Sequence, residues 1–207
     1  MILGLSMAGR ILHLSMAFCG SVCAITGAVS VGNAAPPKAP PDKETLQTVS
    51  SVDLVRYMGT WYEIARTPNR YENKCKGDVI ELYELNQEGR INLKNQCRLQ
   101  DGNTDTAQAH GSVVDTVSKS KLRVTFLWPF YADYWIIDLD KDYRFAVVGE
   151  PDRRYLWIIS REPQIDPQTY QQILKHISEH GYDLSRIIMT PQSQASANLQ
   201  TGTASKK

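Results

Sequence analysis

Short apolar runs recur along the middle of the chain at near-regular intervals, and turn residues separate them. The runs are rich in Val, Ile, Tyr, Phe and Trp, which is typical of an all-β barrel or sandwich. The pattern predicts strands over residues 60–67, 77–86, 90–99, 106–115, 121–128, 132–139, 144–150 and 154–161. Eight such strands can close a barrel that holds one small ligand.

One helix is expected after these strands. Asp166 can cap its first turn, Pro167 suits its first position, and Gly181 is expected to end it. Apolar residues at i, i+3, i+4 and i+7 give this segment a single apolar face. These residues are Tyr170, Ile173, Leu174 and Ile177. The segment Arg186–Met189 is expected to form a short additional strand.

The first 35 residues have the features of a targeting segment. Arg10 supplies a short basic region, residues 11–31 carry no charge, and Gly32 and Ala34 suit positions −3 and −1 of a cleavage site. We therefore predict a signal peptide over residues 1–35 and an exported protein, periplasmic or secreted. An uncleaved anchor is the alternative, because the uncharged run is just long enough to span a bilayer. Its many Ser, Gly, Ala and Thr residues make it a poor span.

Removal of this segment leaves 172 residues (207 − 35), enough for one domain. Residues 36–50 are rich in Pro and are predicted to be an extended linker. Residues 192–207 are polar and are predicted to be a disordered tail, so the folded domain covers about residues 51–191. The mature chain has 22 basic residues (23 − 1) and 22 acidic ones. This balance argues against a nucleic-acid partner, which needs a net basic surface.

Two of the cysteines, Cys19 and Cys23, lie in the targeting segment. Lipidation of either is an alternative to simple cleavage. A bacterial lipoprotein signal places a small residue just before its cysteine, whereas Phe18 and Val22 precede these two. Lipidation is therefore not the favoured reading.

Cys75 and Cys97 remain in the mature chain. An even number of cysteines in an exported protein favours a disulfide, with two free thiols as the alternative. A turn centred near Gln87 and Glu88 would place Cys97 opposite about Asp78 rather than Cys75. A β-bulge or an offset is therefore needed to bring the two sulfurs together.

Three runs appear in order at suitable separations: Gly59–Arg66 (GTWYEIAR), Trp128–Tyr131 (WPFY) and Pro151–Arg161 (PDRRYLWIISR). Together they resemble the lipocalin family, and within it the bacterial subgroup of outer-membrane lipoproteins. The resemblance covers about residues 51–191. It implies an eight-stranded antiparallel up-and-down β-barrel with one C-terminal α-helix and a short final strand.

The resemblance also implies structural residues at the closed end of the barrel. Gly59 and Trp61 of the first strand and Arg161 of the last large strand match residues that pack together there. The family's middle motif, Thr-Asp followed by Tyr, is only partly present. Leu139 replaces the Thr, whereas Asp140 and the Tyr remain. This departure weakens one closed-end contact without threatening the fold.

A ligand cavity follows from the resemblance and from strand alternation. If Trp61 points inward, Glu63 and Ala65 share its face, and Trp157 and Ile159 share the face of Arg161. The expected ligand contacts are Trp157, Tyr131, Ile159, Phe130 and Glu63, and the loop after the first strand adds Arg70, Lys74 and Lys76 for a carboxylate or phosphate headgroup. The plainer alternatives are a hydrogen-bonded structural carboxylate for Glu63, core packing for Trp157 and a solvated surface for the basic loop.

Catalytic patterns are weak in this sequence. His110-Gly111-Ser112 lacks a nucleophile elbow, and His176 and His180 lack the H-E-x-x-H arrangement. No cofactor and no metal site are expected, and the protein is predicted not to be an enzyme. A lipocalin-type enzyme that uses a free cavity thiol is the alternative.

The predicted function is binding and transport or storage of a small hydrophobic ligand, such as a fatty acid or lysophospholipid, in maintenance of the cell envelope. Peripheral association with the outer membrane is expected, and the chain is expected to be a monomer or a homodimer. An integral outer-membrane barrel would carry outward apolar residues and aromatic girdles. The predicted helix and polar tail disfavour it.

Overall fold

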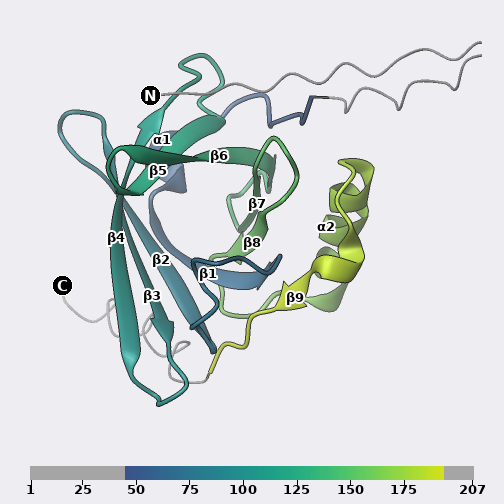
Figure 1. Ribbon diagram of the computed structural model, residues 1–207. Helices are drawn as coiled ribbons and strands as arrows, with labels where there is room; N and C mark the ends of the chain where they lie inside the picture. Colours follow the sequence, from purple (N-terminus) through teal and green to yellow (C-terminus); the bar gives the residue numbers. More distant parts are fainter. Residues whose placement is uncertain (1–44, 194–207) are drawn as a thin grey trace, which may run out of the picture. The chain divides into compact units, whose positions relative to one another are not determined.

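The computed structural model describes residues 45–193 of the 207-residue chain, and these form an antiparallel β-barrel with a helix outside it (Figure 1). The predicted signal peptide, most of the linker and the end of the tail lie outside the described residues. The strands are β1 (Gly59–Arg66), β2 (Gly77–Leu85), β3 (Ile91–Arg98), β4 (Thr104–Val113), β5 (Lys121–Leu127), β6 (Phe130–Leu139), β7 (Phe145–Gly149), β8 (Leu156–Ser160) and β9 (Ile188–Met189). The helices are α1 (Leu54–Tyr57), α2 (Pro167–Glu179) and the short 3-10 helix η1 (Leu184–Arg186).

The sheet closes on itself because β2 pairs with β1 as well as with β3. Its order is β2-β3-β4-β5-β6-β7-β8-β1-β9, and every described pair is antiparallel. Neighbouring barrel strands therefore follow one another along the chain. The predicted up-and-down barrel, its C-terminal helix and its short final strand are confirmed.

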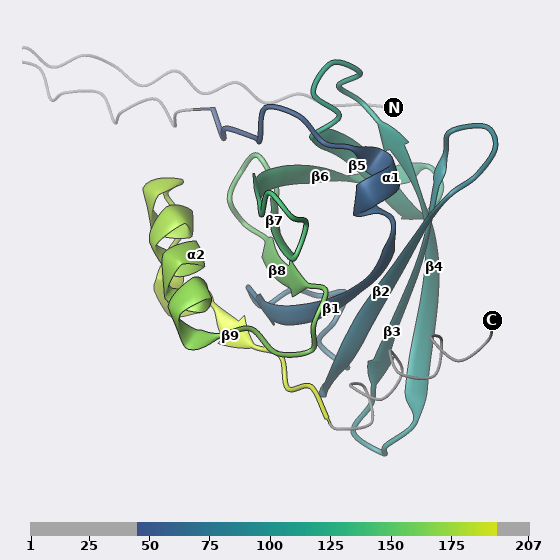
Figure 2. The same ribbon diagram turned by 180° about the vertical axis from the view of Figure 1, so that it is seen from behind.

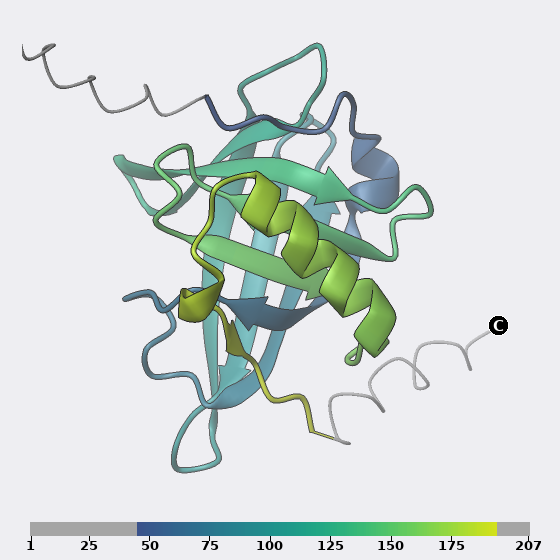
Figure 3. The same cartoon turned by 90° about the vertical axis from the view of Figure 1, so that its right-hand side faces the viewer.

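Helix α2 lies across the outside of the barrel (Figure 3). The Asp166 side chain accepts a hydrogen bond from the backbone N–H of Thr169 at 2.9 Å, and Pro167 occupies the first turn. Ile173 and Ile177 are buried against the outer face of the sheet, in a cluster that includes Ile158. The helix thereby covers a second hydrophobic core outside the barrel. Burial of each such side chain contributes about 1.5–3 kcal/mol to the stability of the fold.

The closed end combines α1 with the start of β1 (Figure 2). Trp61 is fully buried, and the guanidinium carbon of Arg161 lies 3.7 Å from the centre of its ring. Arg161 also donates hydrogen bonds to the carbonyl oxygens of Thr60 and Met58 at 2.8 and 2.9 Å. Gly59 has φ +96°, and an added Cβ would lie 3.3 Å from Arg161 Nη1. A glycine therefore suits both the backbone angle and the space.

Asp140 serves the turn between β6 and β7. It accepts hydrogen bonds from the backbone N–H groups of Asp142 and Arg144, and it forms a 2.8 Å ion pair with Arg144. The hydrogen bond from the Arg144 side chain lowers the pKa of Asp140 to about 2. Tyr143, in the same turn, accepts a 2.8 Å hydrogen bond from the Asp53 N–H through its hydroxyl. Asp140 thus holds the turn itself, and Tyr143 connects the turn to the segment before α1.

The packed chain extends beyond residues 51–191 at both ends. Leu46, within the predicted linker, is buried, and the Val49 N–H donates to the carbonyl of Ile136 at 3.0 Å. Gln192, within the predicted tail, donates through Nε2 to the carbonyls of Glu63 and Val79 at 2.9 and 3.0 Å. Local composition does not reveal these contacts, because they depend on distant strands.

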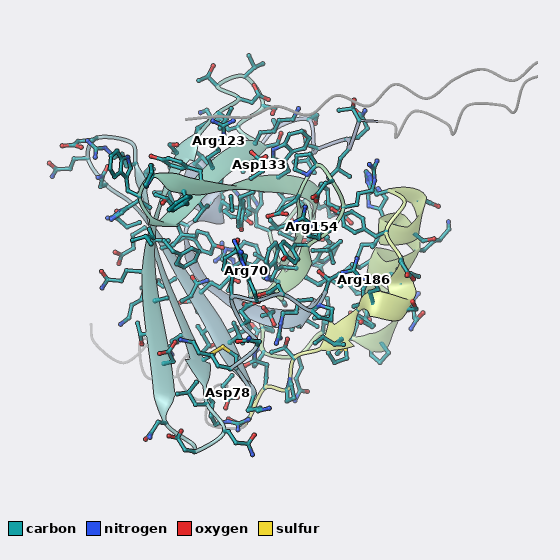
Figure 4. All side chains as sticks on the ribbon, viewed as in Figure 1. Arg70, Asp78, Arg123, Asp133, Arg154 and Arg186 are labelled. Carbon is teal, nitrogen blue, oxygen red and sulfur yellow. A yellow bond between two sulfur atoms is a disulfide. The ribbon has the colours of Figure 1, made fainter. Side chains whose placement is uncertain are left out.

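The Cys75–Cys97 disulfide is present, with 5.6 Å between the Cα atoms, and Figure 4 draws it as a yellow bond. Pairing of β2 with β3 shifts register between Gly77 and Ile80. That shift is the irregularity that the hairpin register required.

The predicted final strand over residues 186–189 is shorter than expected, because Leu184–Arg186 forms η1 and only Ile188–Met189 pairs with β1.

Candidate functional site

A cavity of about 610 Å³ opens from the barrel. This volume lies in the range of small-molecule sites, roughly 300–1,000 Å³. Residues of β2 to β8 and of the loop between β1 and β2 form its wall. The aromatic part of the wall consists of Tyr71, Tyr83, Phe126, Phe130, Tyr131, Tyr134 and Trp157. The cavity can therefore surround a mostly apolar molecule.

Most residues expected to contact a ligand lie in this wall. They are Trp157, Tyr131, Ile159, Phe130, Arg70 and Lys74. Trp157 donates a hydrogen bond from Nε1 to Glu72 Oε2 at 3.0 Å, and its ring centre lies 6.1 Å from that of Tyr155. The loop between β1 and β2 thereby holds the indole in place. Glu63 and Lys76 are not part of the wall.

Glu63 is a buried structural carboxylate. Arg66 donates to it from Nη1 at 2.7 Å, and the Thr190 hydroxyl donates to the same oxygen. Burial, followed by the negative charge of Glu72, raises the pKa of Glu63 well above its ordinary value. A register shift in β1 between Glu63 and Ala65 brings Arg66 to the Glu63 side. The same shift places Ala65 in the outer core instead of on the face of Trp61.

The loop after β1 is less basic at the cavity than its sequence indicates. Lys74 forms a 2.6 Å ion pair with Asp105, and the Arg70 guanidinium lies 5.1 Å from the ring centre of Tyr71. The charged residues of the wall are Arg70 and Lys74 against Glu72, Glu81, Asp105 and Asp133. Figure 4 labels Arg70 and Asp133, which come from the loop and from β6. The wall thus carries more carboxyl groups than cations. The charge of the cavity wall therefore does not by itself select an anionic ligand.

The hairpin between β5 and β6 presents an apolar rim beside the opening. The rim consists of Phe126, Leu127, Trp128, Phe130 and Tyr131, all exposed, with Trp128 76% and Leu127 70% accessible. All of these except Trp128 also line the cavity. Exposed apolar patches of this kind mark interaction sites.

A connected polar group, which we call the floor cluster, joins α1 to the cavity wall: it consists of Tyr57 of α1 and the wall residues Glu81, Tyr83 and Tyr134. The hydroxyl of Tyr134 lies 2.7 Å from that of Tyr57 and 2.9 Å from that of Tyr83, and Tyr83 donates to Glu81 Oε2. Burial raises the pKa of Glu81 to about 7; the Tyr83 hydrogen bond lowers it and the charge of Glu72 raises it. Sequence reasoning did not select Glu81. Its alternation with Val79 and Tyr83 along β2 was the available signal.

The catalytic alternatives find little support in the described residues. Cys75 and Cys97 both line the cavity, but as a disulfide they offer no free thiol. His176 Nδ1 lies 2.8 Å from Asp138 and His176 Nε2 lies 3.2 Å from His180, on the outside of the barrel. Within residues 45–193 no group of three or more His, Cys, Asp or Glu side chains is placed to hold a metal ion. No helix of that part of the chain is both long and apolar enough to cross a bilayer.

A family model described as a lipocalin-like domain matches residues 52–192. The chain belongs to the lipocalin family. This lipocalin is 37% identical over 172 residues to the outer membrane lipoprotein Blc of Escherichia coli (strain K12), a match that covers 83% of this chain and 95% of Blc. It is 34% identical over 174 residues to temperature-induced lipocalin-1 of Arabidopsis thaliana, covering 80% of this chain and 93% of the relative. The Blc relationship confirms the bacterial lipocalin subgroup predicted from the three sequence runs.

Solved structures agree on the fold of this lipocalin. Insecticyanin of the tobacco hornworm Manduca sexta superposes with a TM-score of 0.60 at 20% identity, over 73% of this chain and 87% of that one. At this identity the likeness concerns the fold. The lipocalin family binds small hydrophobic ligands.

Proposed function

We propose that this lipocalin binds a long-chain lipid, a fatty acid or lysophospholipid, in the barrel cavity and transports or stores it without catalysis. The observation that carries the proposal is the cavity of about 610 Å³ with its aromatic and aliphatic wall. Burial of about fifteen methylenes at ~0.8 kcal/mol each yields on the order of 12 kcal/mol gross. Association and chain ordering offset roughly 4 kcal/mol or more of this. Micromolar binding therefore requires no ion pair.

The cell envelope is the proposed place of action. The Blc relatives are named outer membrane lipoproteins, which supports a periplasmic or outer-membrane location. The apolar rim supports peripheral contact with a membrane, because Trp128 and Phe130 are exposed next to the opening through which a lipid would pass. Arg70 is the wall cation without a carboxylate ion pair among the described contacts, and we assign it to an anionic headgroup.

Titration of the delipidated protein with hexadecanoate and with a lysophospholipid tests the proposal. Saturable binding by calorimetry is expected, with a change in tryptophan fluorescence. Trp157→Ala should weaken binding by roughly 1–3 kcal/mol through lost contact area. Trp135→Phe is the matched control, because that ring lies 4.3 Å from Lys121 and is not part of the wall. Equal affinities of wild type and Trp157→Ala would show that Trp157 does not contact the ligand.

A further inference from the structure

Glu81 is a nearly buried carboxyl group, 5% exposed, in the wall of an otherwise largely apolar cavity. It lies opposite Trp61 of β1, so it belongs to the closed end of the barrel. We propose that the floor cluster is a subsite for a hydrogen-bond donor, a hydroxyl or an ammonium group, at the buried end of a long apolar ligand. Glu81 is the acceptor. The inference rests on the proposed lipid-binding function and specifies the class of lipid.

Within residues 45–193, only one of the two carboxyl oxygens of Glu81 has a hydrogen-bond donor. Its Oε2 accepts from the Tyr83 hydroxyl, whereas no described residue donates to Oε1 or forms an ion pair with the carboxylate. Arg66, the buried cation of β1, forms its ion pairs with Glu63 and Glu72. Oε1 thus has no donor in the described part of the chain, and because Glu81 lines the cavity a donor for this oxygen can come from a molecule within the cavity.

A second oxygen lacking a donor lies on the neighbouring strand. Asn95 of β3 pairs directly with Glu81 of β2, and both residues line the cavity. Side chains opposite each other in this way have Cβ atoms about 5 Å apart. Asn95 Oδ1 is buried and has no hydrogen-bond partner in the described structure. Two acceptor oxygens, Glu81 Oε1 and Asn95 Oδ1, therefore belong to neighbouring residues of the wall. A hydrogen-bond donor on the ligand can pair with them, whereas an aliphatic tail cannot.

The three tyrosines direct their hydrogen bonds toward Glu81 rather than into the cavity. A hydroxyl has one proton to donate. Because Tyr83 gives its proton to Glu81, it accepts from Tyr134, which leaves Tyr134 to accept from Tyr57. Each phenol proton is used within the cluster. Above pH 7, where Glu81 is a carboxylate, the polar capacity that this group leaves for a ligand is thus acceptor capacity.

The energetic consequence depends on the end of the ligand. A fully apolar tail that displaces water from Glu81 leaves Oε1 without a donor, whereas a terminal hydroxyl replaces the lost water. An unsatisfied buried acceptor costs enough to change affinity by roughly tenfold or more. The cavity should therefore prefer lipids whose far end carries a donor.

Competition between 16-hydroxyhexadecanoate and hexadecanoate, measured by calorimetry on the full folded protein, tests the inference. Wild type should bind the hydroxylated acid roughly tenfold more tightly. Glu81→Leu should lose this preference while it still binds hexadecanoate. Glu81→Gln keeps a carbonyl oxygen and should retain the preference for the hydroxyl, but it should lose any preference for 16-aminohexadecanoate.

Glu84→Leu is the matched control, because it makes the same change on the same strand at an exposed residue outside the cavity wall and should leave the hydroxyl preference unchanged. Equal affinity of wild type for the hydroxylated and plain acids overturns the subsite and leaves the proposed function standing. A preference that persists in Glu81→Leu also overturns it. Failure of wild type to bind either acid overturns the proposed function and the subsite together.

Discussion

Replacement of Glu81 by Gln should stabilise the fold at alkaline pH and change it little at acidic pH. The pKa of this carboxyl rises from 4.5 to about 7 on folding, chiefly because the group is buried. The folded state therefore holds a proton that the unfolded state releases, so wild-type stability is full below pH 4.5 and falls as pH rises toward 7. Moving a pKa this far corresponds to about 3 kcal/mol.

Urea unfolding at pH 4 and pH 8 measures this effect. The quantity to compare is the gain in the free energy of unfolding of Glu81→Gln over wild type. This gain should be larger at pH 8 than at pH 4, by up to about 3 kcal/mol. Glu150→Gln makes the same charge change at a half-buried carboxyl whose pKa is also raised to about 7, mainly by burial. Solvent screening should make its effect smaller. An equal difference at both pH values for Glu81→Gln would refute the argument from burial.

Three further predictions concern the frame of the barrel and its rim. Arg161→Ala should lower the free energy of unfolding by about 2 kcal/mol, through lost packing on Trp61 and unpaired carbonyls, and leave lipid preference unchanged; unaltered melting with abolished binding would contradict the structural role. Removal of the Cys75–Cys97 bridge, which spans a sequence separation of 22, should cost about 3 kcal/mol in urea unfolding, and a thiol titration of native protein that finds both cysteines free would contradict it. Trp128→Ser should reduce sedimentation with phosphatidylglycerol vesicles without altering affinity for hexadecanoate, and unchanged sedimentation would exclude the rim from membrane contact.

Local pattern predicted the barrel because each strand carries its own alternation and turns. The predicted strand β8, for example, contains Trp157 and Ile159 on one face, and both line the cavity. Helix α1 escaped prediction because four residues, one of them the exposed Val55, give no periodicity. Its stability depends on the Asp53 cap and on packing at the closed end.

The site was predictable where it is apolar and not where it is polar. Trp157 follows from strand parity together with the lipocalin resemblance. Glu63 was misplaced because its pairing with Arg66 needs a register shift that alternation does not reveal. Glu81 was overlooked because a charged residue in a strand ordinarily faces solvent. Alternation along β2 puts Glu81 on the face of Tyr83, but only closure of the sheet brings Tyr134 to this cluster and turns that face into the inside of the barrel.

Native mass spectrometry of gently purified protein tests the central claim most directly, because it detects a ligand retained in the cavity. The expected spectrum shows one long-chain lipid per chain, lost on delipidation and restored by added hexadecanoate or lysophospholipid, and reduced in Trp157→Ala. A protein that carries no lipid when purified and takes up none on addition, while folded with its Cys75–Cys97 bridge intact, would contradict lipid binding in the barrel.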